Sequence, residues 1–151
     1  MNEIFLSPIS LLKNNAVQDV IKCNNFTSKH GLTLSYEQAQ ELIETKHQSL
    51  KNTGRIEIEG GAINKIINAF HDSPHIDGAN YASVLNSLVE TFYYFKNETL
   101  EAISDDQLID AMKAHFNESC GGSIELLQGR ELELLTAKIK AGIVELLGGA
   151  Y

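Results

Sequence analysis

The chain has 151 residues, of which 43% are hydrophobic, and its formal net charge is −8. This length and hydrophobic content predict a single folded domain over residues 1–151 and argue against a disordered chain. Twelve Lys and Arg against twenty Asp and Glu leave too little basic surface to neutralise phosphates, so nucleic acids and anionic membranes are excluded as expected partners.

The N-terminal segment does not have the pattern of a targeting sequence. Residues 1–12 are mildly apolar, but they lack a basic region and are interrupted by Pro8, unlike a signal peptide. No stretch approaches the roughly 18 consecutive apolar residues of a transmembrane helix. Cys23 and Cys120 form no Cys-x-x-Cys pair and are typical of reduced thiols. We therefore expect a cytoplasmic protein.

Apolar residues that recur every three or four positions predict about six helices. The first is expected over residues 10–23. The second begins after Ser35, where Gln38 completes a capping box, and His47 continues its apolar stripe. The third covers residues 63–70 and ends before Pro74, because the residue before a proline is disfavoured in the helical conformation.

The second half of the chain predicts three longer helices. One is expected over residues 79–102 and another after Ser104, whose hydroxyl can cap the helix. The last begins after Ser123 and ends at residues 148–149. Its expected inward face consists of Leu127, Leu134, Leu135, Ile139, Ile143 and Leu146. The predicted fold is therefore mainly α, an irregular bundle of about six helices.

Two short segments on either side of the second helix alternate between apolar and polar residues. They are residues 32–34 and residues 55–59, and alternation with a period of two indicates β-strands. The pattern leaves room for one short two-stranded β ribbon that would rest on the helices, because so short a pair is not stable alone.

Several segments resemble a family of small proteins of unknown function from Gram-positive bacteria. The resemblance covers about residues 10–145, and residues 92–98 are its most specific part. The other segments that carry it are residues 23–24, 31–35, 53–55, 60–61, 70–74, 80–81 and 104–106. The resemblance implies a bacterial, single-domain protein and transfers no activity, ligand or catalytic residue.

The best candidate for a metal site is a turn that carries His71, His75 and Asp77. His71 and His75 are four residues apart, a spacing that can place two ligands on one side of a helix. Pro74 intervenes, so the three side chains belong to a helix end and a turn. The alternative is a polar turn that ends the helix and in which Asp72 and Ser73 bond local backbone groups.

The most unusual local feature is a run of four aromatic residues, Phe92-Tyr93-Tyr94-Phe95. Phe92 and Phe95 continue the apolar stripe of their helix, and the two tyrosines cannot both share it. Either this helix is central and buried on several sides, or a tyrosine reaches an interface, where tyrosine is enriched. Tyr93 and Tyr94 are therefore the candidate binding residues.

Two functions remain open at the level of sequence. The first is a non-catalytic, cytoplasmic protein-interaction module that binds a partner protein or forms a homo-oligomer. The alternative is a small metal- or ligand-dependent enzyme or sensor that uses the turn with His71, His75 and Asp77. No cofactor, substrate or reaction is indicated by the sequence.

Overall fold

The computed structural model describes residues 8–53, 57, 61–99 and 102–146. Within these ranges it has six helices of eight residues or more, which confirms the mainly helical prediction. They are α1 (Pro8–Ile21), α3 (Tyr36–Thr53), α4 (Ile63–Phe70), α5 (Tyr81–Glu98), α6 (Asp105–Asn117) and α8 (Leu132–Leu146). Four shorter turns connect them: α2 (Asn24–Thr27), η1 (Ser28–His30), α7 (Ile124–Leu126) and η2 (Leu127–Glu131).

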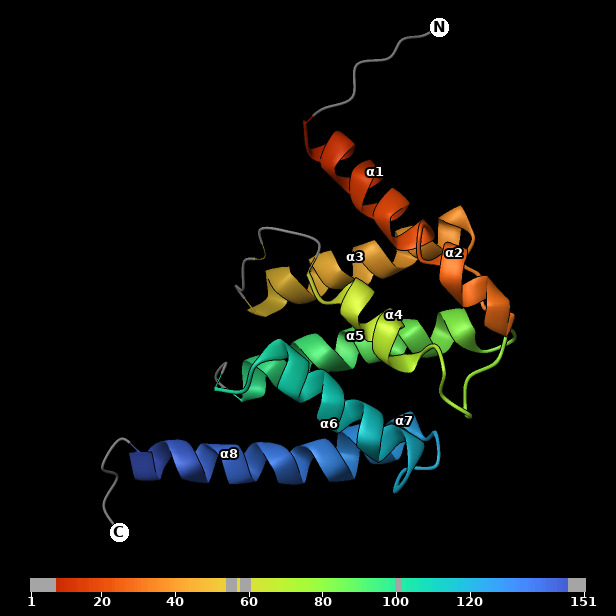
Figure 1. Cartoon of the computed structure of the whole chain (residues 1–151). Helices are drawn as coiled ribbons and strands as arrows, with labels where there is room; N and C mark the ends of the chain where they lie inside the picture. Colours follow the sequence, from red (N-terminus) through yellow and green to blue (C-terminus); the bar gives the residue numbers. More distant parts are fainter. Residues whose placement is uncertain (1–7, 54–56, 58–60, 100–101, 147–151) are drawn as a thin grey trace, which may run out of the picture.

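Helix α5 is the centre of the bundle. It contacts α3, α4, α6, α7 and α8, and Figure 1 shows α3 above it, α8 below it, and α4 and α6 in front. Helix α1 packs on α3 and points away from the rest of the bundle (Figure 1). The central position of α5 explains why its sequence is apolar on more than one side.

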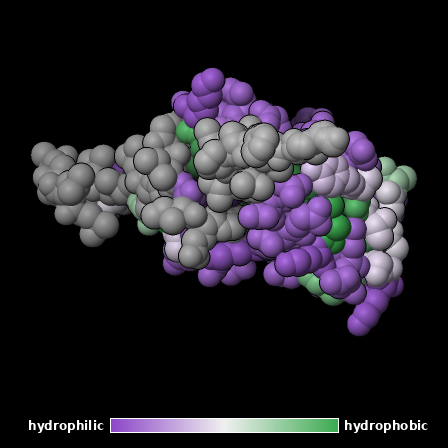
Figure 2. All heavy atoms as spheres, turned by 90° about the horizontal axis from the view of Figure 1, so that it is seen from above, coloured by the Kyte–Doolittle hydropathy of each residue, from purple (hydrophilic) through white to green (hydrophobic). Residues whose placement is uncertain are grey.

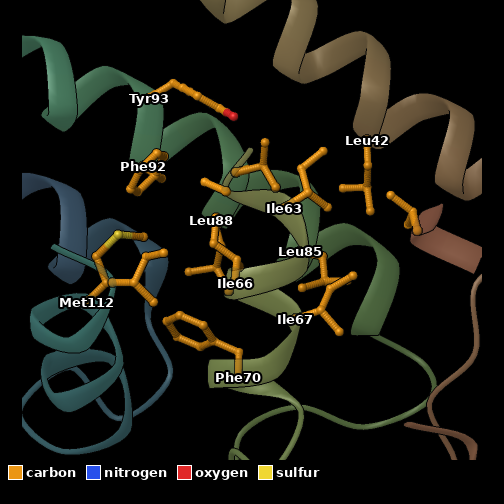
Figure 3. Packing of buried hydrophobic residues seen from close by; sticks show 14 of the residues in the cluster. Leu42, Ile63, Ile66, Ile67, Phe70, Leu85, Leu88, Phe92, Tyr93 and Met112 are labelled. Carbon is orange, nitrogen blue, oxygen red and sulfur yellow. The ribbon is translucent and has the colours of Figure 1, made fainter. Parts of the chain in front are cut away.

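The core lies where α4 crosses α5. Ile66 and Phe70 of α4 and Leu88 and Phe92 of α5 are completely buried, and Figure 3 shows these side chains pointing toward one another. Phe70 also meets Phe116 of α6 edge to face, with ring centroids 5.5 Å apart. This contact joins the three helices, because edge-to-face pairs add to the burial energy.

The predicted helix starts are confirmed at two capping boxes. The hydroxyl of Ser35 accepts from the backbone N–H of Gln38, and the Gln38 side chain accepts from the N–H of Ser35. Ser104 and Gln107 make the same reciprocal pair at the start of α6. Each box satisfies two backbone donors that a helix start leaves without partners.

The proposed β ribbon is not supported. Residues 32–34 are not a strand, and residue 57, the described part of the segment 55–59, is not in a strand either. The backbone N–H and C=O of Leu34 bond to the side-chain amide of Asn24, at 2.9 and 3.0 Å. Leu32 and Leu34 are buried and Thr33 is exposed, so the alternation reflects an extended segment whose partner is a side chain.

The C-terminal helix, residues 124–146, is continuous, but it changes from α-helical to π-helical geometry and back. Between α7 and α8 it contains a π-helical turn, Leu127–Glu131. Leu127 and Leu132 are both completely buried, and their separation of five residues is the spacing of a π turn. Leu134, expected on the inward face, is instead 57% exposed. The prediction for Leu134 was wrong because the extra residue in the π turn rotates the buried stripe.

Helix α5 ends at Glu98, four residues before the predicted end. Lys96, which is 4% exposed, donates to the carbonyl of Ile103 and pairs with Asp105 at 2.9 Å. Both partners follow the turn after α5. The buried ammonium group therefore joins the end of α5 to the start of α6, and the helix could not continue without losing these contacts.

In the coloured part of the surface shown in Figure 2, hydrophilic residues predominate and the hydrophobic areas are small. Across the described ranges, none of the helices has the length and apolar character that a membrane span would need.

Candidate functional site

A hollow with aromatic walls lies between α5 and the C-terminal helix, and its volume is about 530 Å³. Helix α5 lines one side with Glu90, Thr91, Tyr94 and Phe95. The C-terminal helix lines the other side with Glu125, Gln128, Gly129 and Glu133. We call these eight residues the acidic pocket. Its volume is within the range of about 300–1,000 Å³ that is usual for ligand sites.

The π turn forms one wall of the acidic pocket. Gln128 lies in this turn and donates from Nε2 to Oγ1 of Thr91 at 2.6 Å. Thr91 in turn donates to the carbonyl of Ser87, also at 2.6 Å. This chain of hydrogen bonds fixes the π turn to the central helix. Because π turns are rare and occur frequently at functional sites, the coincidence of this one with a hollow is notable.

Gly129 keeps the wall of the pocket open. A Cβ atom at this position would meet no other atom within 4 Å, so the space in front of it is empty. A glycine inside a helix is less stable than alanine by about 0.5–1 kcal/mol. The chain therefore has a residue at the pocket wall that lowers the stability of the helix and leaves the hollow accessible.

The pocket has an apolar base and an acidic rim. Phe95 is buried at the base, whereas Glu90, Glu125 and Glu133 are exposed. None of the salt bridges found between described residues involves these three carboxylates. Arg130 of the same π turn does not neutralise the rim, because its side chain bonds to Glu131 and to the carbonyl of Ser119.

The structure separates the two candidate tyrosines. Tyr93 is 1% exposed, whereas Tyr94 is 52% exposed and lines the acidic pocket. Figure 3 shows Tyr93 and Phe92 leaving α5 in different directions within the core. The helix is therefore central, as the first alternative predicted. Of the two tyrosines, Tyr94 is the one placed where it can contact a ligand.

The hydroxyl of Tyr93 belongs to a buried ionic cluster. It donates to Oε1 of Glu57 at 2.7 Å, and Nζ of Lys46 lies 3.2 Å from the same oxygen. The side chains of Lys46 and Glu57 are 9% and 6% exposed. Lys46 continues the buried stripe of α3, whereas His47, expected there, is only partly buried. The cluster joins α3 to α5 through residue 57.

The backbone at Gly61 lies directly against this ionic cluster. Gly61 has φ of +71°, and a Cβ there would lie 2.0 Å from Oε1 of Glu57 and 2.9 Å from Nζ of Lys46. A larger residue would displace the ion pair. The ionic cluster is therefore a closely packed, structural part of the core.

His71, His75 and Asp77 do not converge. The ring of His71 packs against Phe26 and His30, with centroids 5.4 and 5.1 Å apart. Nε2 of His75 donates to the carbonyl of Asn117 at 3.0 Å. Oδ1 of Asp77 accepts from the backbone of residues 79 and 80, both at 2.9 Å.

These contacts give the metal hypothesis no support. Among the described residues, no three His, Cys, Asp or Glu side chains form a group that could hold a metal ion. The hydroxyl of Ser73 accepts from the backbone N–H of His75, as the alternative of a polar turn expects, whereas Asp72 pairs with Lys113. A metal- or ligand-dependent enzyme or sensor at this turn stays a prediction.

Two buried groups near α2 have raised pKa values. Burial raises the pKa of Tyr81 to about 12, and the nearby Cys23 adds to this effect. Burial also raises the pKa of the Cys23 thiol, and the charge of Asp19 adds to this effect. A thiol with a raised pKa is a weak nucleophile at neutral pH, so Cys23 has the properties of a structural residue.

Most of the acidic pocket was not predicted from the sequence. Gln128, Gly129 and Glu133 appeared only as parts of the last helix. A single glycine inside a helical pattern, Gly129, was the available signal, because such a residue lowers helix stability and often has a packing or functional reason. The pairing of Gln128 with Thr91 depends on the π turn, which apolar periodicity does not reveal.

Comparison with known protein families identifies the family of this chain. A model described as "Family of unknown function (DUF6323)" matches residues 19–145. Neither a curated protein nor a solved structure matches the chain. The family match covers α3 to α6, the acidic pocket and most of α8. The chain therefore belongs to the DUF6323 family of unknown function.

Proposed function

We propose that the protein is a non-catalytic interaction module that binds a partner protein through the acidic pocket. The observation that carries this proposal is the position of Tyr94. It is 52% exposed on the central helix and lines a hollow of about 530 Å³. Tyrosine suits a contact surface because it combines a large apolar body with a polar tip.

Exposed apolar residues near the pocket support a protein partner. Among residues 14–53, 57, 61–99 and 102–142, whose side-chain burial the structure describes, four large hydrophobic residues are exposed: Tyr36, Tyr94, Leu126 and Leu134. Tyr94 lines the pocket, and each leucine follows a pocket carboxylate in the chain, Glu125 or Glu133. Apolar surface rimmed by polar residues is typical of protein interaction sites.

The side chains of the pocket favour binding over catalysis. The eight lining residues include no histidine or cysteine. The hydroxyl of Thr91 is already used, since it donates to Ser87 and accepts from Gln128. Among the described residues, neither lining hydroxyl is hydrogen-bonded to a general base, the arrangement that activates a hydroxyl as a nucleophile.

We also propose that the protein acts in the cytoplasm of a Gram-positive bacterium. This part rests on the sequence resemblance and on the two cysteines. Both cysteines are free and buried, which is compatible with a reducing compartment.

Two glycine variants test the proposal. Gly129→Leu places a side chain in the open space of the pocket, and Gly142→Leu places the same side chain on α8 outside the pocket, again without a neighbour within 4 Å. Tagged wild type and both variants are purified from the source cells, and bound proteins are quantified by mass spectrometry. We expect one protein to be retained by wild type and Gly142→Leu and lost with Gly129→Leu. Equal retention by all three, or no retained protein, would overturn the proposal.

A further inference from the structure

The charge around the acidic pocket identifies the class of its partner. Glu90, Glu125 and Glu133 are exposed at its rim, and none takes part in a salt bridge found between described residues. The whole chain carries a formal net charge of −8. Three like charges around one hollow repel one another, and a cation that enters the hollow removes this repulsion.

We propose that the acidic pocket binds an arginine- or lysine-bearing segment of a partner protein. This inference rests on the proposed function and deepens it. A basic side chain would place its charged end among the carboxylates of the rim. Its aliphatic part would lie along the apolar base formed by Phe95, as long basic side chains do on apolar surfaces.

Tyr94 adds a second attraction for a cation. Its ring lies edge to face with Phe95, with centroids 4.9 Å apart and planes at 86°, and its side chain is 52% exposed. A cation over the face of an aromatic ring is held by the ring quadrupole. Arginine fits this surface best, because its planar guanidinium both stacks on a ring and pairs with a carboxylate.

The negative charges of the rim disfavour a second copy of this chain or a nucleic acid as the occupant of the acidic pocket. A second copy of this acidic chain would bring further negative charge to the rim, and like-charge contacts across an interface are unfavourable. A nucleic acid would be repelled for the same reason. A free polyamine carries the same cationic groups as a basic segment, but it has no apolar side chains to cover the exposed Leu126 and Leu134.

Selection of peptides tests this inference without knowledge of the partner. A random dodecapeptide display library is selected against wild type and counter-selected against Gly129→Leu. We expect the enriched peptides to carry Arg or Lys and to lack Asp and Glu. The combined variant Glu90→Gln/Glu125→Gln/Glu133→Gln is expected to bind these peptides about tenfold more weakly, since each exposed pair contributes modestly. Raising the salt concentration from about 0.05 M to about 0.5 M is expected to weaken the binding of these peptides to wild type as well.

Three results would overturn the inference, and they separate it from the proposed function. Enriched peptides that are neutral or acidic, yet lost with Gly129→Leu, would refute the charge selection and leave the binding function standing. Peptides that show no dependence on Gly129 would refute both. Spermidine that displaces the peptides at a concentration below their own dissociation constant would assign the pocket to a free polyamine.

Discussion

Gln128 of the π turn donates to Thr91 of the central helix at 2.6 Å. This hydrogen bond connects the π turn of the C-terminal helix to the helix that contacts α3, α4, α6, α7 and α8. The extra residue of the π turn has two consequences. It brings Gln128 and Gly129 to the wall of the acidic pocket, and it rotates Leu134 out of the core.

The π turn predicts that two leucines only two residues apart contribute very differently to the free energy of unfolding. Leu132→Ala is expected to lower the free energy of unfolding by about 2–5 kcal/mol, because Leu132 is completely buried. Leu134→Ala is expected to change it by less than about 0.5 kcal/mol, since Leu134 is 57% exposed. Urea unfolding followed by circular dichroism measures both. A large loss at Leu134 would mean that the helix is regular and the π turn is absent.

Gly129→Ala is expected to raise the free energy of unfolding by about 0.5–1 kcal/mol, because alanine is the better helix former and its Cβ meets no atom within 4 Å. Gly142→Ala on α8 is the matched control and is expected to stabilise the protein similarly. Chemical denaturation gives both values. Destabilisation by Gly129→Ala alone would show that the space in front of Gly129 is filled.

Removal of the hydroxyl group alone is expected to change the free energy of unfolding by different amounts at the two adjacent tyrosines. Tyr93→Phe removes a hydrogen bond to the carboxylate of Glu57 and is expected to lower the free energy of unfolding by about 2 kcal/mol. Tyr94→Phe changes an exposed side chain and is expected to stay within about 0.5 kcal/mol of wild type. Thermal and urea unfolding of the two variants test this. Equal effects would contradict the separate roles of the two residues.

The raised pKa of Tyr81 predicts that the protein loses stability in strong base. Its pKa in the folded protein is raised to about 12 by burial, whereas an unfolded tyrosine titrates near 10. The folded state therefore holds this proton more tightly, and the resulting stability is complete below pH 10. It is lost as the pH rises from about 10 to about 12, by an amount of about 2–3 kcal/mol.

The urea midpoints of wild type and Tyr81→Phe at pH 9 and pH 11 measure this effect. We expect the wild type to lose more stability than the variant between the two pH values, because phenylalanine has no proton to release. Parallel losses would show that Tyr81 is not the group responsible.

Much of the fold could be predicted because it depends on local signals. The capping box at Ser35 and the N-cap at Ser104 were visible as short motifs, and the apolar stripe of α4 is regular from Ile63 to Phe70. The segment at Leu32 and Leu34 could not be assigned in this way. Its alternation was real, but the hydrogen-bond partner that replaces a second strand is the side chain of Asn24, ten residues away in the sequence.

The candidate site was predicted only in part. Tyr94 was identified because four consecutive aromatic residues cannot all be buried on one face of a helix. Lys46 was missed because a charged residue within an apolar stripe gives no sign of a buried partner, and its partner Glu57 lies outside α3. Gln128 and Gly129 were missed because the π turn depends on contacts with α5 that the helical periodicity does not contain.

The most direct test of the binding role of the acidic pocket is photo-crosslinking from Tyr94. The photoreactive amino acid p-benzoylphenylalanine replaces Tyr94 in one form and Tyr36 in a second, since Tyr36 is also exposed, at 41%, but lies on α3. Both forms are irradiated in the source cells and their adducts are identified by mass spectrometry. The account predicts an adduct with one basic partner protein from position 94 and none from position 36. No adduct from position 94, or the same adducts from both positions, would contradict it.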